Sequence, residues 1–99
     1  MGTELIIAPE AANDLDEAYA WYEAQRVGRG EDFLTRVDAC FQAILRHPES
    51  YAVIEASFRR ALVRKFPFAV FYEYTDETVT VFSVFHCSMD PEKWRRRLR

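Results

Sequence analysis

The side chains best suited to chemistry are a histidine and an arginine in the second half of the chain. His86 ends a run of β-forming residues, and an imidazole there can serve as acid or base because it titrates near neutral pH. Arg64 lies in a basic stretch before that run and offers a fixed cation. A group that can give or take a proton and a fixed cation together suit a reaction in which a proton moves while negative charge develops. Arg64 and His86 are therefore the candidate catalytic residues, and a structural hydrogen-bonding role is the alternative for His86.

The cysteines and clustered carboxylates indicate neither a thiol nucleophile nor a metal site. Cys40 and Cys87 are far apart and lack the spacing of metal ligands. Cys87 directly follows His86, and neighbouring strand residues point to opposite faces, so the two are not expected to act together. We expect no cofactor or metal. Two pairs of carboxylates are predicted to lie on solvated helical faces: Asp14 with Glu17, and Glu31 with Asp32.

Charge is distributed unevenly along the chain. The net charge is -3, but residues 1–50 carry ten acidic and four basic side chains, whereas residues 51–99 carry six and nine. If the C-terminal tail folds back beside the basic stretch, these nine cations form one patch that can bind an acidic target. The alternative is that the arginine-rich ends are merely solvated. The candidate target-binding residues are Arg59, Arg60, Arg64, Lys65, Lys93, Trp94, Arg95, Arg96 and Arg97.

The first half of the chain predicts a short strand and two helices. Residues 3–8 are rich in β-forming side chains, and Pro9 suits the first turn of a helix. Residues 9–26 carry an apolar stripe at helical spacing, and the glycines at 28 and 30 end that helix. A second stripe runs from Phe33 until His47 and Pro48 stop the helix. So short a connection makes the two helices an antiparallel pair.

The second half changes to the period of β-strands. From Phe58 onward apolar residues alternate with others, and Pro67 marks a strand start or a bulge. Strict alternation places Val79, Val81 and Phe85 on one face of the last strand, opposite Val84. This strand is apolar on both sides near its end, so it is central in its sheet. Two helices cover only one face, which predicts an exposed aromatic surface on the other.

Composition indicates one small domain, residues 1–99. Hydrophobic residues make up 49% and aromatic residues 15%, which suffices for a single core. No apolar stretch is long enough to cross a bilayer, so we expect no membrane partner. The widely separated cysteines and the lack of an apolar leader indicate a reduced cytoplasmic compartment.

Several segments resemble those of the RelE/ParE toxin superfamily and follow one another in the same order. The stretch from Arg59 to Tyr74, which includes Lys65-Phe66-Pro67-Phe68-Ala69-Val70-Phe71-Tyr72-Glu73, is similar to the second strand of that family and the basic strand before it. The turn Thr75-Asp76-Glu77, the sequence Val84-Phe85-His86 and the basic tail follow in the family's order. Ala20-Trp21-Tyr22-Glu23 and His47-Pro48 add to the resemblance in the helical half.

The resemblance implies an α+β fold with the order β-α-α-β-β-β, in which an N-terminal strand and an antiparallel helix pair precede a three-stranded antiparallel meander and the helices cover one face. It also implies a toxin of a type II toxin–antitoxin system, neutralised by a cognate antitoxin. Trp21 and Tyr22 are the candidate antitoxin-binding residues.

Members of the superfamily differ in target, and this chain departs from the nuclease pattern. RelE-like toxins cut mRNA on the ribosome, whereas ParE-like toxins poison DNA gyrase. Met89 stands where many members have an arginine, and no tyrosine follows Tyr74, so two expected nuclease groups are missing. The prediction is a gyrase poison. The alternatives are a RelE-like endonuclease, a degenerate member that only binds its antitoxin, and a small ligand-binding α+β domain unrelated to toxins.

Overall fold

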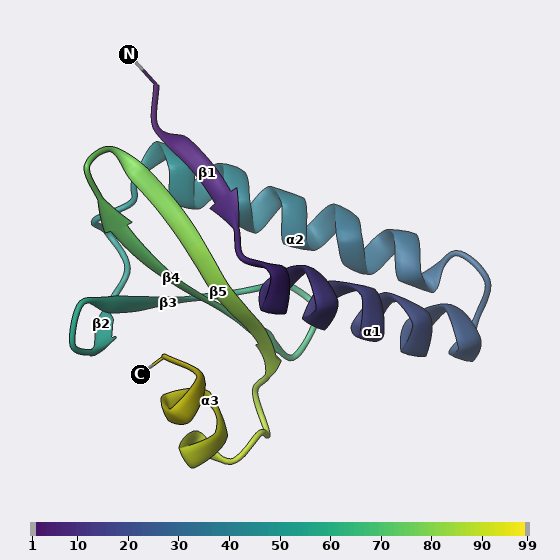
Figure 1. Ribbon diagram of the computed structural model, residues 1–99. Helices are drawn as coiled ribbons and strands as arrows, with labels where there is room; N and C mark the ends of the chain where they lie inside the picture. The colour runs from purple at the N-terminus through teal and green to yellow at the C-terminus, as the bar shows by residue number, and fades with distance from the viewer. Residues whose placement is uncertain (1, 99) are drawn as a thin grey trace.

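A five-stranded sheet forms the centre of the protein in the computed structural model, which describes residues 2–98 (Figure 1). The spatial order of the strands is β1-β5-β4-β3-β2; β1 runs parallel to β5, and the other neighbours are antiparallel. The predicted α+β class and the order of strand, helix pair and meander are confirmed. The elements are β1 (Glu4–Ile7), α1 (Pro9–Gln25), α2 (Arg29–Arg46), β2 (Val53–Glu55), β3 (Phe58–Leu62), β4 (Phe68–Thr75), β5 (Thr78–His86) and α3 (Pro91–Leu98).

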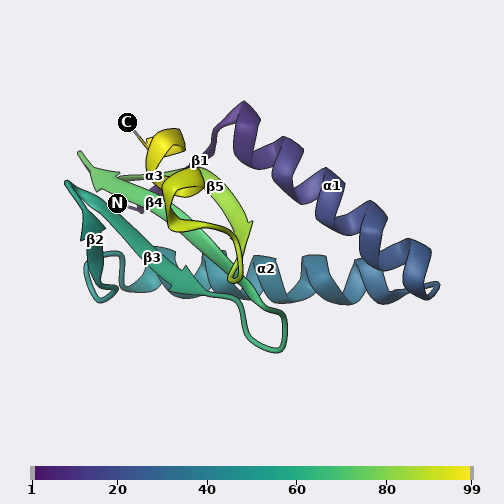
Figure 2. The same ribbon diagram turned by 90° about the horizontal axis from the view of Figure 1, so that it is seen from below.

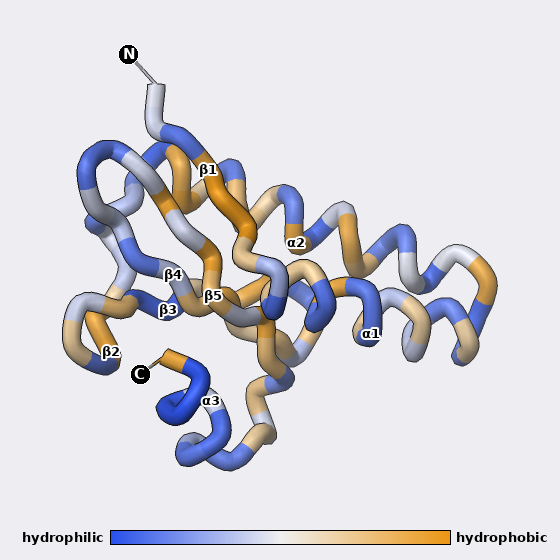
Figure 3. The backbone as a smooth tube through the Cα atoms, viewed as in Figure 1, coloured by the Kyte–Doolittle hydropathy of each residue, from blue (hydrophilic) through white to orange (hydrophobic). Residues whose placement is uncertain are grey.

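Two of these elements are additions to the sequence prediction. The three-residue β2 pairs with β3 at the far edge of the sheet, and it is too short to show a period in sequence. The basic tail forms α3, which Figure 3 draws almost wholly in hydrophilic colours. Its periodicity is hidden because only Trp94 and Leu98 are apolar among its eight residues.

The α1–α2 connection is built on two glycines and one carboxylate. Gly28 has a φ of 89°, which other residues rarely adopt. Gly30 packs so closely that a Cβ atom would lie 2.8 Å from the ring of Tyr19. The Glu23 carboxylate accepts hydrogen bonds from the N–H groups of Gly28 and Gly30, with the Gly30 bond at 3.0 Å, and so satisfies donors at the start of α2. This turn holds α1 and α2 antiparallel, as the shortness of the connection predicted.

An aromatic cluster joins the helix pair to one face of the sheet. Phe33 of α2 is fully buried, and its ring centroid lies 5.3 Å from that of Tyr22, 5.4 Å from Phe66 and 5.0 Å from Phe68. The Tyr72 hydroxyl, beneath the end of α2, donates to the Pro48 carbonyl at 2.7 Å. These contacts form the main core.

A β-bulge in β5 overturns the predicted alternation of that strand. Phe71 pairs with Ser83 while Tyr72 pairs with Val81, so Phe82 is an extra residue on β5. Beyond the bulge the faces exchange. Val84 therefore joins Val79 and Val81 in the main core, and Phe85 turns to the opposite face. The expected grouping of Phe85 with Val79 and Val81 was wrong.

The second face of the sheet is covered, contrary to the expectation of an exposed aromatic surface. Helix α3 lies on the side of the sheet away from α2 (Figures 1 and 2). Trp94 stacks on Phe71 at 5.1 Å between ring centroids, and Leu98 is buried with Phe85 and Ala69. A second small core therefore forms between α3 and the sheet. Among residues 2–98, no helix combines the length and the apolar character needed to cross a membrane.

Candidate functional site

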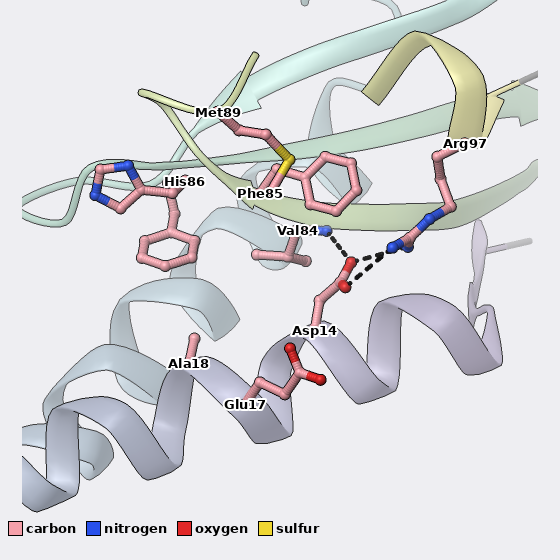
Figure 4. A pocket seen from close by; sticks show the side chains of 9 residues that line it. Asp14, Glu17, Ala18, Val84, Phe85, His86, Met89 and Arg97 are labelled. Atoms are coloured by element: carbon pink, nitrogen blue, oxygen red, sulfur yellow. Dashed lines mark hydrogen bonds and ion pairs between the residues drawn. The ribbon is translucent and has the colours of Figure 1, made fainter. Parts of the chain in front are cut away.

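A pocket of about 320 Å³ lies where α1, the end of β5 and α3 meet, and Asp14 is its most constrained side chain. The Asp14 carboxylate accepts the Val84 N–H at 3.0 Å and pairs with the Arg97 guanidinium at 3.1 and 3.4 Å (Figure 4). Only 10% of the Asp14 side chain and 29% of the Arg97 side chain are exposed. One carboxylate thus links α1, β5 and α3.

Asp14 takes the place of a strand partner. The backbone ladder beside β5 ends where Ala8 donates to the Val81 carbonyl, because the chain then turns into α1. The Val84 N–H lies beyond that end, and the Asp14 carboxylate accepts it. Burial raises the pKa of Asp14 above its ordinary value and outweighs the hydrogen bonds from Val84 and Arg97, which lower it. The prediction that Asp14 is solvated was wrong.

The two candidate catalytic residues lie in different places. The His86 imidazole points away from the Asp14–Arg97 pair (Figure 4). Its Nδ1 atom lies 3.1 Å from the Ser88 N–H, which donates to it, and its ring meets Phe68 edge-on. Arg64 lies in the turn between β3 and β4, not in the sheet as expected, and lines a separate pocket beside α2. Base and cation are therefore not brought together.

Trp21 and Tyr22 meet at an apolar pocket of about 420 Å³. The Trp21 side chain is 59% exposed, whereas Tyr22 is buried and supports it edge-on at 5.0 Å. The remaining lining residues are Ala18, Pro67, Phe68 and His86. We call this the Trp21 pocket. An exposed tryptophan beside an apolar pocket is typical of a protein-binding surface.

The eight predicted cations that lie within residues 2–98 do not form one patch, and the ninth, Arg99, lies outside the described residues. Arg59 donates to the carbonyls of Glu49 and Tyr51, at 3.1 and 2.7 Å, and so holds the loop before β2. Arg60, the next residue, points to the opposite face of the sheet, where its strand partner Phe71 supports Trp94. Arg64 and Lys65 line pockets with α2 on the other side of the sheet from α3.

The cations of α3 differ in their surroundings. Arg97 is held by Asp14 and lies 4.6 Å from the centroid of the Phe85 ring. Arg95 lies over Trp94 at 5.0 Å, while Lys93 and Arg96 are exposed. We call Lys93, Arg95 and Arg96 the α3 basic surface. Trp94 itself is occupied by packing against Phe71.

The two cysteines are predicted to react very differently. Cys40 is buried, its thiol donates to the Leu62 carbonyl at 3.7 Å, and burial raises its pKa to about 11. At pH 8 only about one Cys40 thiol in a thousand is ionised, whereas Cys87 is exposed. We expect iodoacetamide to modify Cys87 in the native protein and Cys40 only in denaturant, as read by mass spectrometry. Equal labelling of both thiols in the native protein would contradict the burial of Cys40.

Sequence reasoning missed the Asp14–Arg97 pair and the contribution of α2 to a basic pocket. For Asp14 a signal existed, because it stands three residues after Ala11 and four before Ala18, both of which are buried. For Arg36 and Arg46, which line the pocket with Arg64, no signal existed, since they belong to the acidic half of the chain. Within residues 2–98 no three His, Cys, Asp or Glu side chains gather as a metal site.

Comparisons with known proteins agree with this architecture. Residues 5–91 match the sequence model of a family described as the ParE toxin of type II toxin-antitoxin system, parDE. A search of curated protein sequences gave no match. A structure of the chromosomal ParDE toxin–antitoxin system from P. aeruginosa is similar, with a TM-score of 0.76 and 14% identity over 85% of this chain and 95% of that one. The toxin–antitoxin complex RelBE2 from Mycobacterium tuberculosis is also similar, with a TM-score of 0.61 and 17% identity over 87% of this chain and 92% of that one.

Proposed function

The chain belongs to the ParE toxin family of type II toxin–antitoxin systems, and we propose that it inhibits growth by poisoning DNA gyrase until a cognate antitoxin neutralises it. The family match to residues 5–91 is the observation that carries this proposal, because it spans the strand–helix–helix–sheet core. We place this activity in the cytoplasm, where gyrase acts.

The Trp21 pocket is the proposed docking site for an apolar part of the antitoxin. Trp21 offers a large exposed surface on α1, and the pocket beside it is lined by Phe68 of β4 and by Pro67, which precedes that strand. An amphipathic segment that folds on binding would bury these side chains.

The surroundings of His86 argue against RNA cleavage, the alternative to gyrase poisoning. The pocket between His86 and α1 contains the Glu17 carboxylate, which repels a phosphate. Its arginine, Arg97, is neutralised by Asp14. Met89 lines the same pocket where many superfamily members carry a further arginine. A nuclease needs preorganised cations here, and loss of one such donor typically costs about 10²- to 10³-fold in rate.

We assign target binding to the α3 basic surface. The triple variant Lys93→Ala, Arg95→Ala, Arg96→Ala leaves the Asp14–Arg97 pair intact, so the fold should persist. We expect it to lose most growth inhibition, because each exposed cation at an interface contributes about 0.5–1 kcal/mol to the free energy of binding an acidic target. Colony formation after induction and gyrase supercoiling in vitro measure the effect, with circular dichroism as the folding control.

The matched control keeps the charge. Arg95→Lys with Arg96→Lys should retain most of the inhibition, since the surface stays basic. Full toxicity of the triple alanine variant would exclude the α3 basic surface as the target site. If induction instead produces sharp cuts in ribosome-bound mRNA, the chain is a RelE-like nuclease. Normal growth together with antitoxin binding identifies a non-toxic member.

A further inference from the structure

A pocket of about 260 Å³ between α2 and the end of β3 gathers three arginines from distant parts of the sequence. Arg36 and Arg46 come from α2, and Arg64 comes from the β3–β4 turn. The remaining walls are formed by Tyr51, Leu62, the buried Cys40 and two alanines of α2. We call this the arginine pocket.

None of these three arginines has a carboxylate partner in the part of the chain that the structure describes. The ion pairs there join Arg26 to Asp32, Arg95 to Glu92, and Arg97 to Asp14. Three arginines that line one pocket give it a positive potential, which favours binding of an anion there. Arg46 gains from its place in the last turn of α2, where a cation offsets the helix dipole. That explanation does not extend to Arg36 in mid-helix or to Arg64 in the turn.

The basic surface continues along α2 into a second pocket of about 370 Å³. The two pockets share Arg36, and the second adds Lys65 and Arg29. Arg29 already lies 4.5 Å from the centroid of the Phe66 ring, so it is partly engaged. From Arg36 to Arg46 the helix rises about 15 Å, a span that an extended peptide covers with roughly five residues. The shape therefore suits a short extended segment.

We propose that the arginine pocket binds an acidic, extended segment of the antitoxin through its Asp or Glu side chains. Guanidinium groups bind carboxylates with two parallel hydrogen bonds. This assignment rests on the proposed toxin function. It adds to the Trp21 pocket a second, electrostatic contact, made by residues that lie far apart in the sequence.

A protein segment fits this surface better than nucleic acid. Asp32 lines the second pocket, and Glu31 and Asp38 are exposed on the same helix. A continuous phosphate backbone would meet these carboxylates, whereas a peptide can place neutral residues opposite them. The net charge of -3 also disfavours the many phosphate contacts on which nucleic-acid affinity depends.

The test uses the whole protein and defined probes in a fluorescence anisotropy titration. The probes are a labelled eight-residue peptide of alternating Glu and Ala, the same peptide with Gln for Glu, and a labelled ten-residue oligothymidine. We expect the Glu peptide to bind at least about tenfold more tightly than the Gln peptide, and its binding to weaken as salt is added.

Variants locate the binding. The triple variant Arg36→Ala, Arg46→Ala, Arg64→Ala should weaken binding of the Glu peptide by at least about tenfold. The corresponding triple lysine variant keeps the charge but loses the paired hydrogen bonds. Its affinity for the Glu peptide should therefore fall between those of the wild-type protein and the triple alanine variant. The triple alanine variant of the α3 basic surface removes the same charge elsewhere and should bind the Glu peptide as the wild-type protein does.

Three outcomes overturn the proposal: equal binding of the Glu and Gln peptides, unchanged binding by the triple alanine variant of the pocket, or tighter binding of oligothymidine than of the Glu peptide. The toxin function is judged separately by growth inhibition. Glu-specific binding in a protein that does not inhibit growth would reject the proposed function and keep the pocket. Growth inhibition without Glu-specific binding would reject the proposed role of the arginine pocket and keep the proposed toxin function.

Discussion

Replacing Phe33 by alanine should lower the free energy of unfolding by about 3–5 kcal/mol, the cost of removing a fully buried aromatic ring and leaving a cavity. Phe33 has no exposed surface, and its ring contacts those of Tyr22, Phe66 and Phe68. These residues come from both helices and the sheet, so the surroundings cannot easily collapse into the space. The midpoint of urea unfolding, followed by circular dichroism, measures the loss.

Val27→Ala is the control for Phe33→Ala. Val27 also lies in the helical half but is 90% exposed, so its truncation should change stability by no more than about 0.5 kcal/mol. Expected melting temperatures follow the same order, with a fall of roughly 12–40 °C for Phe33→Ala. A loss below about 1 kcal/mol for Phe33→Ala would mean that the aromatic cluster does not join the helices to the sheet as described.

The second large effect is expected at Asp14. Asp14→Ala should cost about 2–3 kcal/mol, because it leaves the Val84 N–H and the Arg97 guanidinium without their acceptor in a largely buried place. The full penalty of a deeply buried pair does not apply, since 29% of the Arg97 side chain reaches solvent. Unfolding in urea gives the cost. In a Trp21→Phe background, which leaves Trp94 as the single tryptophan, the intrinsic fluorescence reports whether α3 remains packed on Phe71.

Two further variants isolate the pair. Asp16→Ala removes the same side chain from an exposed position two residues away and should be nearly neutral. Arg97→Met alone also destabilises, but combined with Asp14→Ala it should cost less than the two single changes added together, by about 1 kcal/mol or more. Strict additivity would show that Asp14 and Arg97 act independently and that the carboxylate does not fasten α3.

Much of the fold could be predicted from local sequence. The apolar stripes before Gly28 and after Gly30 set the two helices, and the short link between them set their antiparallel pairing, because helix period and turn length are local properties. Pro67 marked the start of β4, and the apolar character of β5 on both sides marked it as a central strand. Trp21 was a candidate antitoxin-binding residue through the family resemblance, and its side chain is exposed in the structure.

The sites depended on tertiary structure, since they are made by residues that no short window of sequence contains. One extra residue, Phe82, exchanges the faces of β5 and sends Phe85 under α3, an effect that strict alternation cannot foresee. Asp14 and Arg97 meet across 83 positions, and their pairing turns a charged tail into a packed helix. The sequence shows which residues are basic but not which of them share a surface. Alternation along β3 separates Arg59 from Arg60, and α2 brings Arg36 and Arg46 beside Arg64, because charge acts through distance in space and not through order in the chain.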